Sequence, residues 1–227
     1  MSLHALPSAR RRGLSMVELM VGLAVGMVVV ALAVSAMSHQ ARASRRVLLE
    51  ARTTQELRAA TDLLARHVRR AGHWSEAARG VWRADAASPP ANPHTFTPEA
   101  PDRLRFTYSS PAQAAADGVA SRDHFGFRLR DGILDIELGE GNWQPLTDPG
   151  VLHVTELKLI PRSQDHPLPA ACAEPCAGSA GNCPPSVRVR GLDIMIDAVA
   201  TRDPGIHRQA ATYVRPRNDM QTGQCKP

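Results

Sequence analysis

The chain has 227 residues and a mass of 24.5 kDa, enough for one sizeable hydrophobic core with a small appendage. Its formal net charge of +5 is uneven, because Arg10, Arg11 and Arg12 supply three of these charges and leave the remainder nearly balanced. Four Phe, three Trp and two Tyr are scattered without the basic stripe and interleaved aromatic residues of a nucleic-acid-binding surface, so nucleic acid is not expected as a partner.

The N-terminus combines a basic segment with a long apolar one. Residues 1–13 contain no acidic residue, and Leu19–Met37 carries no formal charge and a single serine. An apolar helix of about 20 residues spans a bilayer, and arginines in front of it are expected to stay cytoplasmic. The alternative is a plain signal anchor or a secretory signal peptide, because residues 31–33 and 34–36 offer small-residue cleavage sites.

Glu18 stands at the start of the apolar segment and argues against a plain signal sequence. An unpaired carboxylate at that depth costs up to a few kcal/mol, and a signal sequence gains nothing from it. An ionisable residue in such a position usually marks a specific partner.

The segment Gly13–Glu18, which reads Gly-Leu-Ser-Met-Val-Glu, resembles the class III leader of type IV prepilins and of type II secretion pseudopilins. The resemblance implies that a prepilin peptidase cuts between Gly13 and Leu14 on the cytoplasmic side of the membrane. The same enzyme would then methylate the new amine of Leu14. Leucine replaces the phenylalanine that is commonest at that place in the family.

Cleavage would place a cationic amine at Leu14, four residues before Glu18. In a bundle of parallel helices, Glu18 of one subunit would neutralise the Leu14 amine of its neighbour and so set the axial register of assembly. Gly22 and Gly26 form a small-xxx-small pair that allows close helix packing, although glycine is also simply common in membrane helices.

The helix is expected to continue beyond the apolar run, with residues 14–41 as the transmembrane and filament-core part and residues 42–72 as an amphipathic continuation. Apolar residues recur there at three- and four-residue steps. The residues of this stripe are Leu57, Ala60, Leu64, Val68 and Ala71. Arg69 and Arg70 suit the negative end of the helix dipole, and Gly72 is the expected C-cap.

Residues 73–227 are expected to form a globular head. Its first part, residues 73–102, is rich in proline and predicts an irregular loop. Strand-like alternation follows, and Asp131-Gly132 between two alternating runs predicts a tight hairpin turn. Gly191 shifts the alternation of its strand, which indicates a bulge. One long helix followed by an antiparallel sheet gives the α+β fold class, which is also the fold of pilins.

Four cysteines lie in the last quarter of the chain: Cys172, Cys176, Cys183 and Cys225. An even number of cysteines behind an export-type N-terminus predicts disulfides formed outside the cytoplasm. A zinc site is the alternative, because Cys172 and Cys176 are closely spaced, but no second tight Cys or His pair follows. Cys225 is expected to pair with one of the other three, and the spacing leaves its partner open.

No catalytic motif, phosphate loop or metal-ligand spacing occurs in the sequence, so neither an enzymatic activity nor a cofactor or metal is expected. Within the superfamily, residues 57–74, 125–146 and 212–218 resemble those of PilW-type minor pilins. The resemblance implies a structural subunit that helps prime pilus assembly.

The implied partners are the prepilin peptidase, other minor and major pilins, and the inner-membrane assembly platform. The implied location is the inner membrane, with one membrane pass and a periplasmic head, and then the pilus. Two alternatives stay open: a J-type minor pseudopilin of type II secretion, and a periplasmic membrane-anchored enzyme or binding protein.

Overall fold

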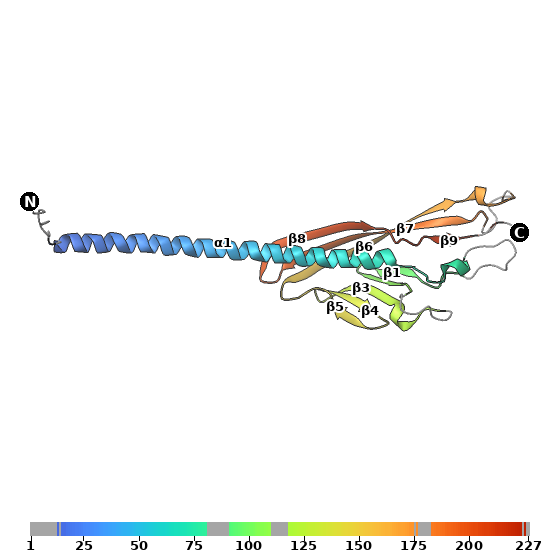
Figure 1. Ribbon diagram of the computed structural model, residues 1–227, viewed down its shortest axis with the longest axis horizontal. Coiled ribbons are helices and arrows are strands. Elements are labelled where there is room, and N and C mark those ends of the chain that lie inside the picture. The colour runs from blue at the N-terminus through green and yellow to red at the C-terminus, as the bar shows by residue number, and fades with distance from the viewer. Residues whose placement is uncertain are drawn as a thin grey trace, which may run out of the picture. The chain divides into compact units, whose positions relative to one another are not determined.

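The computed structural model describes residue 13 and residues 15–80, 91–109, 118–174, 176, 183–223 and 225. The chain divides into two compact units, Met1–Leu48 and Leu49–Pro227. The helix α1 (Met16–Arg70) contributes its first part to the first unit and its remainder to the second (Figure 1).

In the first unit, α1 exposes a continuous apolar segment from Leu19 to Met37. Every helical side chain from Met16 to Leu48 is exposed, Met16 by 86%. The Ala, Leu and Met residues of this segment have high helix propensity, and a window within it has a mean hydropathy of 2.6. Its length and composition suffice to cross a membrane. So large an apolar surface is unfavourable in water, and it requires lipid or other helices around it.

In the second unit, the rest of α1 is amphipathic, which confirms the predicted stripe. The buried apolar residues of this part are Leu57, Ala60, Leu64, Ala65 and Val68. The side chains of Arg58, Asp62 and Arg66 are exposed on the opposite face. The helix ends at Arg70, and Gly72 has a φ of 73°, the left-handed conformation of the expected C-cap.

The first sheet has five antiparallel strands in sequence order. They are β1 (Phe96–Ala100), β2 (Arg103–Thr107), β3 (His124–Arg130), β4 (Ile133–Leu138) and β5 (Trp143–Pro145). The turn between β3 and β4 confirms the predicted hairpin, because Asp131 has a φ of 52° and Gly132 a φ of 76°. Short 3-10 helices at Ala77–Gly80 and Ser121–Asp123 precede β1 and β3.

The second sheet has four antiparallel strands, with β7 between β6 and β8 and with β9 also paired to β7. They are β6 (Leu152–Pro167), β7 (Ser186–Ala200), β8 (Asp203–Val214) and β9 (Met220–Thr222), and a 3-10 helix at Pro169–Ala171 follows β6. The N–H of Leu159 faces away from β7 and donates to the carbonyl of Pro101 at 2.8 Å. By alternation, Pro161 and Pro167 occupy the same outward-facing edge, where proline costs no ladder hydrogen bond.

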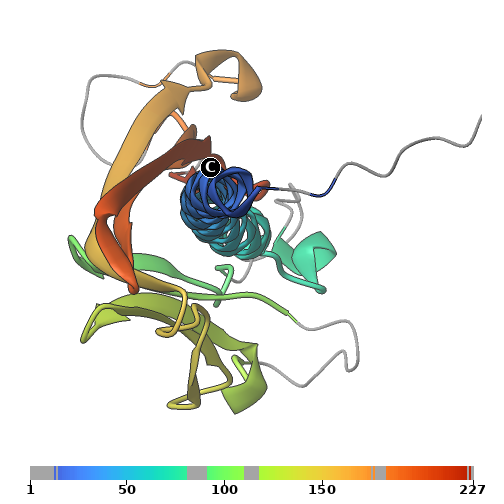
Figure 2. The same cartoon turned by 90° about the vertical axis from the view of Figure 1, so that its left-hand side faces the viewer.

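One hydrophobic core joins the second part of α1 to both sheets, which flank it on adjoining sides (Figure 2). The largest fully buried side chains of this core are Leu64, Leu104, Phe106, Tyr108, Phe127, Leu134, Leu152, Leu192, Ile194 and Ile196. Each such side chain stabilises the fold by about 1.5–3 kcal/mol relative to exposure. The α+β class is therefore confirmed, with two sheets where the sequence indicated one.

Two local predictions were wrong. The strand β1 lies inside the predicted loop 73–102, where Pro98 is tolerated because β1 is an edge strand. No register shift occurs at Gly191 within β7, whose residues are all described; Gly191 pairs regularly with Arg162. The Tyr213 side chain instead lies against the backbone of Gly191, in the space that a Cβ would occupy.

Candidate functional site

The predicted processing site lies just before the first turn of α1. Gly13 is exposed and, like Ser15, belongs to no helix or strand, while Leu14 lies outside the described residues. The carbonyl of Ser15 accepts the first helical hydrogen bond, from the N–H of Leu19 at 3.1 Å. A protease binds its substrate in an extended form, so a glycine outside the helix and exposed to solvent suits cleavage.

Glu18 lies in the first turn of α1 and is exposed. A carboxylate is favoured there because the unpaired N–H groups make a helix N-terminus electropositive. The same position leaves the carboxylate accessible to a cation on another chain. No salt bridge among the described residues involves Glu18.

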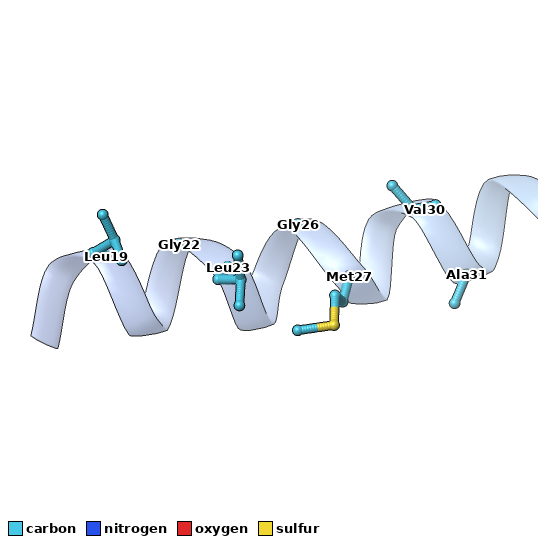
Figure 3. A pocket seen from close by; sticks show the side chains of 7 residues that line it. All are labelled: Leu19, Gly22, Leu23, Gly26, Met27, Val30 and Ala31. Atoms are coloured by element: carbon cyan, nitrogen blue, oxygen red, sulfur yellow. The ribbon is translucent and has the colours of Figure 1, made fainter. Parts of the chain in front are cut away.

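A shallow apolar groove follows Glu18 along the helix (Figure 3). Glu18, Gly22 and Gly26 recur at four-residue steps and therefore share one stripe of the helix. A Cβ added at Gly22 or Gly26 would meet no other atom within 4 Å, so the two glycines form an open floor. The walls are Leu19, Leu23, Met27, Val30 and Ala31. A second helix can approach closely along such a groove because no side chain separates the backbones.

The four cysteines form two disulfides, Cys172–Cys225 and Cys176–Cys183, with Cα–Cα distances of 5.3 and 5.7 Å. Both distances lie in the usual range for disulfides. Three of the sulfur atoms, on Cys172, Cys176 and Cys183, lie within 4.8 Å of one another. This proximity would also suit a metal, but all four cysteines are oxidised and none is free. The partner of Cys225, which the spacing in the sequence left open, is therefore Cys172.

The tail after β8 is fastened to the end of α1, an arrangement that the sequence did not predict. The backbone N–H of Arg217 donates to the carbonyl of Arg69 at 3.0 Å, and the Asn218 amide donates to the carbonyl of Ala71 at 3.4 Å. Arg190 of β7 donates to the Asn218 carbonyl at 3.0 Å. Since Cys225 follows in this tail, its disulfide joins the cap of α1 to the loop that carries Cys172.

Two carboxylates are fully buried on the face of the first sheet that points away from α1. Glu137 accepts two hydrogen bonds from Arg105, at 2.9 and 2.6 Å, and one from the N–H of Gly141 at 2.8 Å. Asp135 accepts from Arg128 at 3.0 Å and from Arg130 at 2.9 Å. The alternation of apolar and charged residues along β3 and β4 predicts that these charged side chains share one face of the sheet. The sequence does not reveal which arginine pairs with which carboxylate.

The ionisable groups of this region are engaged in structural pairs. Burial opposes ionisation of Glu137, but the hydrogen bonds from Arg105 and Gly141 outweigh it and lower the pKa of the carboxyl. Burial lowers the pKa of His67, whose Nδ1 lies 3.2 Å from the Tyr108 hydroxyl. Carboxylates committed to arginines in this way stabilise a sheet and are poorly suited to proton transfer.

Two family models match the chain, and together they cover residues 8–34 and 46–216. The model described as "Prokaryotic N-terminal methylation motif" matches residues 8–34, which include the predicted cleavage site, Glu18 and both groove glycines. The model described as "Prepilin peptidase-dependent protein B" matches residues 46–216, from the amphipathic part of α1 through β8 to the tail. No curated protein and no solved structure gives a significant match.

Proposed function

We propose that this chain, which belongs to the prepilin peptidase-dependent protein B family, is a minor type IV pilin of the PilW type that helps prime pilus assembly. The coarser identity rests on the family: the chain is a pilin-type protein that depends on a prepilin peptidase and carries an N-methylation motif. Pilin-type families are structural rather than catalytic. The first unit supports a filament subunit, and the resemblance of residues 57–74, 125–146 and 212–218 to PilW-type minor pilins supports the finer role.

The observation that carries the proposal is a single helix segment that combines three features. It begins just after an exposed glycine, it has a carboxylate in its first turn, and its apolar side chains are exposed as far as Leu48. Such a segment is stable in lipid before assembly and among other helices after it. A subunit that moves from a membrane into a filament core needs a helix that is stable in both environments.

In this proposal residues 1–13 are the leader, residues 14–41 are the membrane and filament-core helix, residues 42–72 continue it, and residues 73–227 are the head. Removal of residues 1–13 discards three arginines and exposes the amine of Leu14. Glu18 of one subunit then pairs with that amine on its neighbour, since each charge is costly alone in an apolar environment. Gly22 and Gly26 let the neighbouring helix approach closely.

The head resides in the periplasm before assembly, and the two disulfides support that location because such bonds form in oxidising compartments. The partners are the prepilin peptidase, the inner-membrane assembly platform, and the major and other minor pilins. We place the subunit at the tip of the pilus, a position that a long first helix and a head stabilised by two disulfides would suit.

Mass spectrometry of the N-terminus from membrane and sheared-pilus fractions tests the proposal. The expected polypeptide begins at Leu14, carries one extra methyl group and occurs in the pilus fraction at low abundance. A start at Val34 or Met37, or an intact Met1, refutes processing as a pilin. A methylated Leu14 on a protein that co-purifies only with type II secretion components assigns it to the pseudopilins instead.

A further inference from the structure

Three sulfur atoms of the head form a cluster that two separate disulfides do not require. The Cys172 sulfur lies within 4.8 Å of the sulfur atoms of both Cys176 and Cys183, which are bonded to each other. Cys172 itself is bonded to Cys225 in the tail. All four side chains are partly exposed, so a thiol in solution can reach them. One sulfur of the tail disulfide therefore lies beside the other disulfide, at a place open to solvent.

The backbone holds Cys172 and Cys183 near each other independently of the disulfides. The strands β6 and β7 pair from end to end, and beyond them the N–H of Leu168 donates to the carbonyl of Pro185 at 2.8 Å. The N–H of Cys172 donates to the carbonyl of Pro169 at 3.3 Å, at the end of the 3-10 helix that follows β6. Because the paired strands hold both ends of the loop between β6 and β7, breaking either disulfide should leave these sulfur atoms close together.

The tail reaches this cluster through a different strand. β9 pairs with β7, with Thr222 opposite Ser186, and Cys225 follows Thr222 by three residues. The Cys225 sulfur lies outside the three-sulfur cluster, although it is bonded to one member of it. Its bond to Cys172 is the covalent link between the tail and the loop. Reducing this bond therefore places a free thiol inside the cluster.

We propose that Cys172, Cys176 and Cys183 form a disulfide-exchange site that transfers a free thiol from the tail bond to the loop. In the first step a dithiol, such as the active-site pair of a thiol–disulfide oxidoreductase, reduces Cys172–Cys225. The dithiol becomes a disulfide, and its two electrons and two protons pass to the sulfur atoms of Cys172 and Cys225.

The second step takes place within the cluster and needs no further reductant. The Cys172 thiol loses its proton to water, and the thiolate attacks the Cys183 sulfur. The bond Cys172–Cys183 forms, the bond Cys176–Cys183 breaks, and Cys176 leaves as a thiolate that takes up a proton. Attack on Cys176 releases Cys183 in the same way. One disulfide is broken and one is formed, so the oxidation state of the chain is unchanged.

The loop can close with either disulfide at similar free energy. The native pair Cys176–Cys183 is separated by 7 residues, and Cys172 precedes Cys176 by four. The probability of loop closure falls with about the 3/2 power of loop length, so the longer loop is about twofold less favourable. Where the fold favours neither arrangement, about a third of the molecules should hold the exchanged bond.

Exchange keeps the tail bond open after a single reduction. Once Cys172 is bonded to Cys183, it cannot re-form its bond to Cys225 until the exchange reverses. The loop stays closed by a disulfide, whereas the tail retains only its non-covalent contacts with α1 and β7. A dithiol can thereby loosen the tail from the cap of α1 without opening the loop. The inference concerns the head alone and does not depend on the proposed pilin role.

The full-length variant Cys225→Ser tests the exchange without a reductant, because it carries a single free thiol within the cluster. The purified chain is incubated at about pH 8, near the usual thiol pKa of about 8.5. It is then quenched with acid, blocked with a maleimide in urea and mapped by peptide mass spectrometry without reduction. We expect about a third or more of the label on Cys176 or Cys183, with a peptide that links Cys172 to the other of the two. Label on Cys172 alone overturns the proposal.

The matched control is Cys172→Ser, whose single free thiol is on Cys225, outside the cluster. Its label should stay on Cys225 over the time in which Cys225→Ser reaches its final distribution. Equal redistribution in the two variants would show that any thiol of the head exchanges, and would overturn the assignment to the cluster. Tryptophan fluorescence in urea verifies that both heads are folded.

The wild type tests the same step without a substitution and decides the matter where a variant does not fold. About one equivalent of dithiothreitol should first expose Cys172 and Cys225. Label on Cys172 should then fall while label on Cys176 or Cys183 rises and that on Cys225 stays constant. Below the thiol pKa of about 8.5 this transfer should quicken about tenfold per pH unit, because the thiolate is the nucleophile. Label that stays on Cys172 and Cys225, or that reaches the loop without Cys225, contradicts the exchange.

Discussion

The backbone N–H of Arg217 donates a 3.0 Å hydrogen bond to the carbonyl oxygen of Arg69, so that the C-terminal tail caps the last turn of α1. Helix ends leave four carbonyl groups unsatisfied, and here partners far along the chain supply the missing donors. The pairing couples the orientation of the tail to the end of the helix. Gly72, two residues after the end of the helix, has a positive φ of 73°.

Replacing Gly72 with alanine should lower the free energy of unfolding of the head by about 1–2 kcal/mol, because a residue with a Cβ is strained in the left-handed region. The new Cβ would also lie 3.1 Å from a terminal nitrogen of Arg190. Urea denaturation followed by tryptophan fluorescence measures the change. Gly22→Ala, where nothing lies within 4 Å, is the control and should leave the head unchanged. Equal stability of Gly72→Ala and the wild type would contradict the strained cap.

Replacing Glu18 with valine should leave processing at Gly13 largely intact and abolish incorporation into filaments. The expected reason is that the Leu14 amine of the neighbouring subunit loses its counter-ion. Immunoblots of membrane and sheared-pilus fractions measure the two steps separately. Glu18→Asp keeps the charge with a shorter reach and should retain part of the incorporation. Normal incorporation of Glu18→Val would refute the proposed register contact.

Replacing Glu137 with glutamine should destabilise the head by about 2 kcal/mol at neutral pH, since it removes charge-assisted hydrogen bonds from a buried group. The lowered pKa of Glu137 in the folded state gives this contribution a defined pH dependence. It is present above the unfolded pKa of about 4.3 and is lost as the pH falls through the lower folded value.

The difference in unfolding midpoint between wild type and Glu137→Gln, measured from neutral pH down to about pH 3, should therefore shrink towards acid. Glu140→Gln makes the same chemical change at an exposed position and should have little effect at any pH. A difference that grows towards acid would show that the carboxyl is protonated in the folded head.

Removing the two disulfides one at a time should have unequal effects. The pair Cys172–Cys225 is separated by 53 residues and the pair Cys176–Cys183 by 7. Loop-closure entropy predicts losses of about 4 and about 2.5 kcal/mol for the respective double serine variants. Urea denaturation measures both, and peptide mapping without reduction identifies the pairs. A peptide that links Cys172 to Cys176 would contradict the connectivity.

The long apolar helix and its cap could be predicted because their signals are local. Uninterrupted hydropathy, a three- and four-residue stripe ending at Val68, and Gly72 each depend on near neighbours in the sequence. The Asp131-Gly132 turn is equally local, since only positive φ at both residues closes so tight a hairpin.

Long-range features could not be read in the same way. The division into two sheets depends on β6, whose edge meets the turns at Pro101 and Gly132 through hydrogen bonds that no pattern encodes. The sequence suggested a bulge at Gly191 because the alternation of buried side chains along β7 begins only after this residue. In the structure the glycine instead leaves room for the side chain of Tyr213 on the neighbouring strand β8. The disulfide pairing and the Arg105–Glu137 pair likewise join residues whose proximity is created only by the fold.

The prolines on the outer edge of β6 limit the pairing of this edge with a strand of another head. Along residues 161–167, only Ser163 and Asp165 present an outward N–H, because Pro161 and Pro167 have none. A second strand aligned there would find two donors where a full ladder needs four. Two heads that meet at this edge are therefore less able to join their sheets into an aggregate.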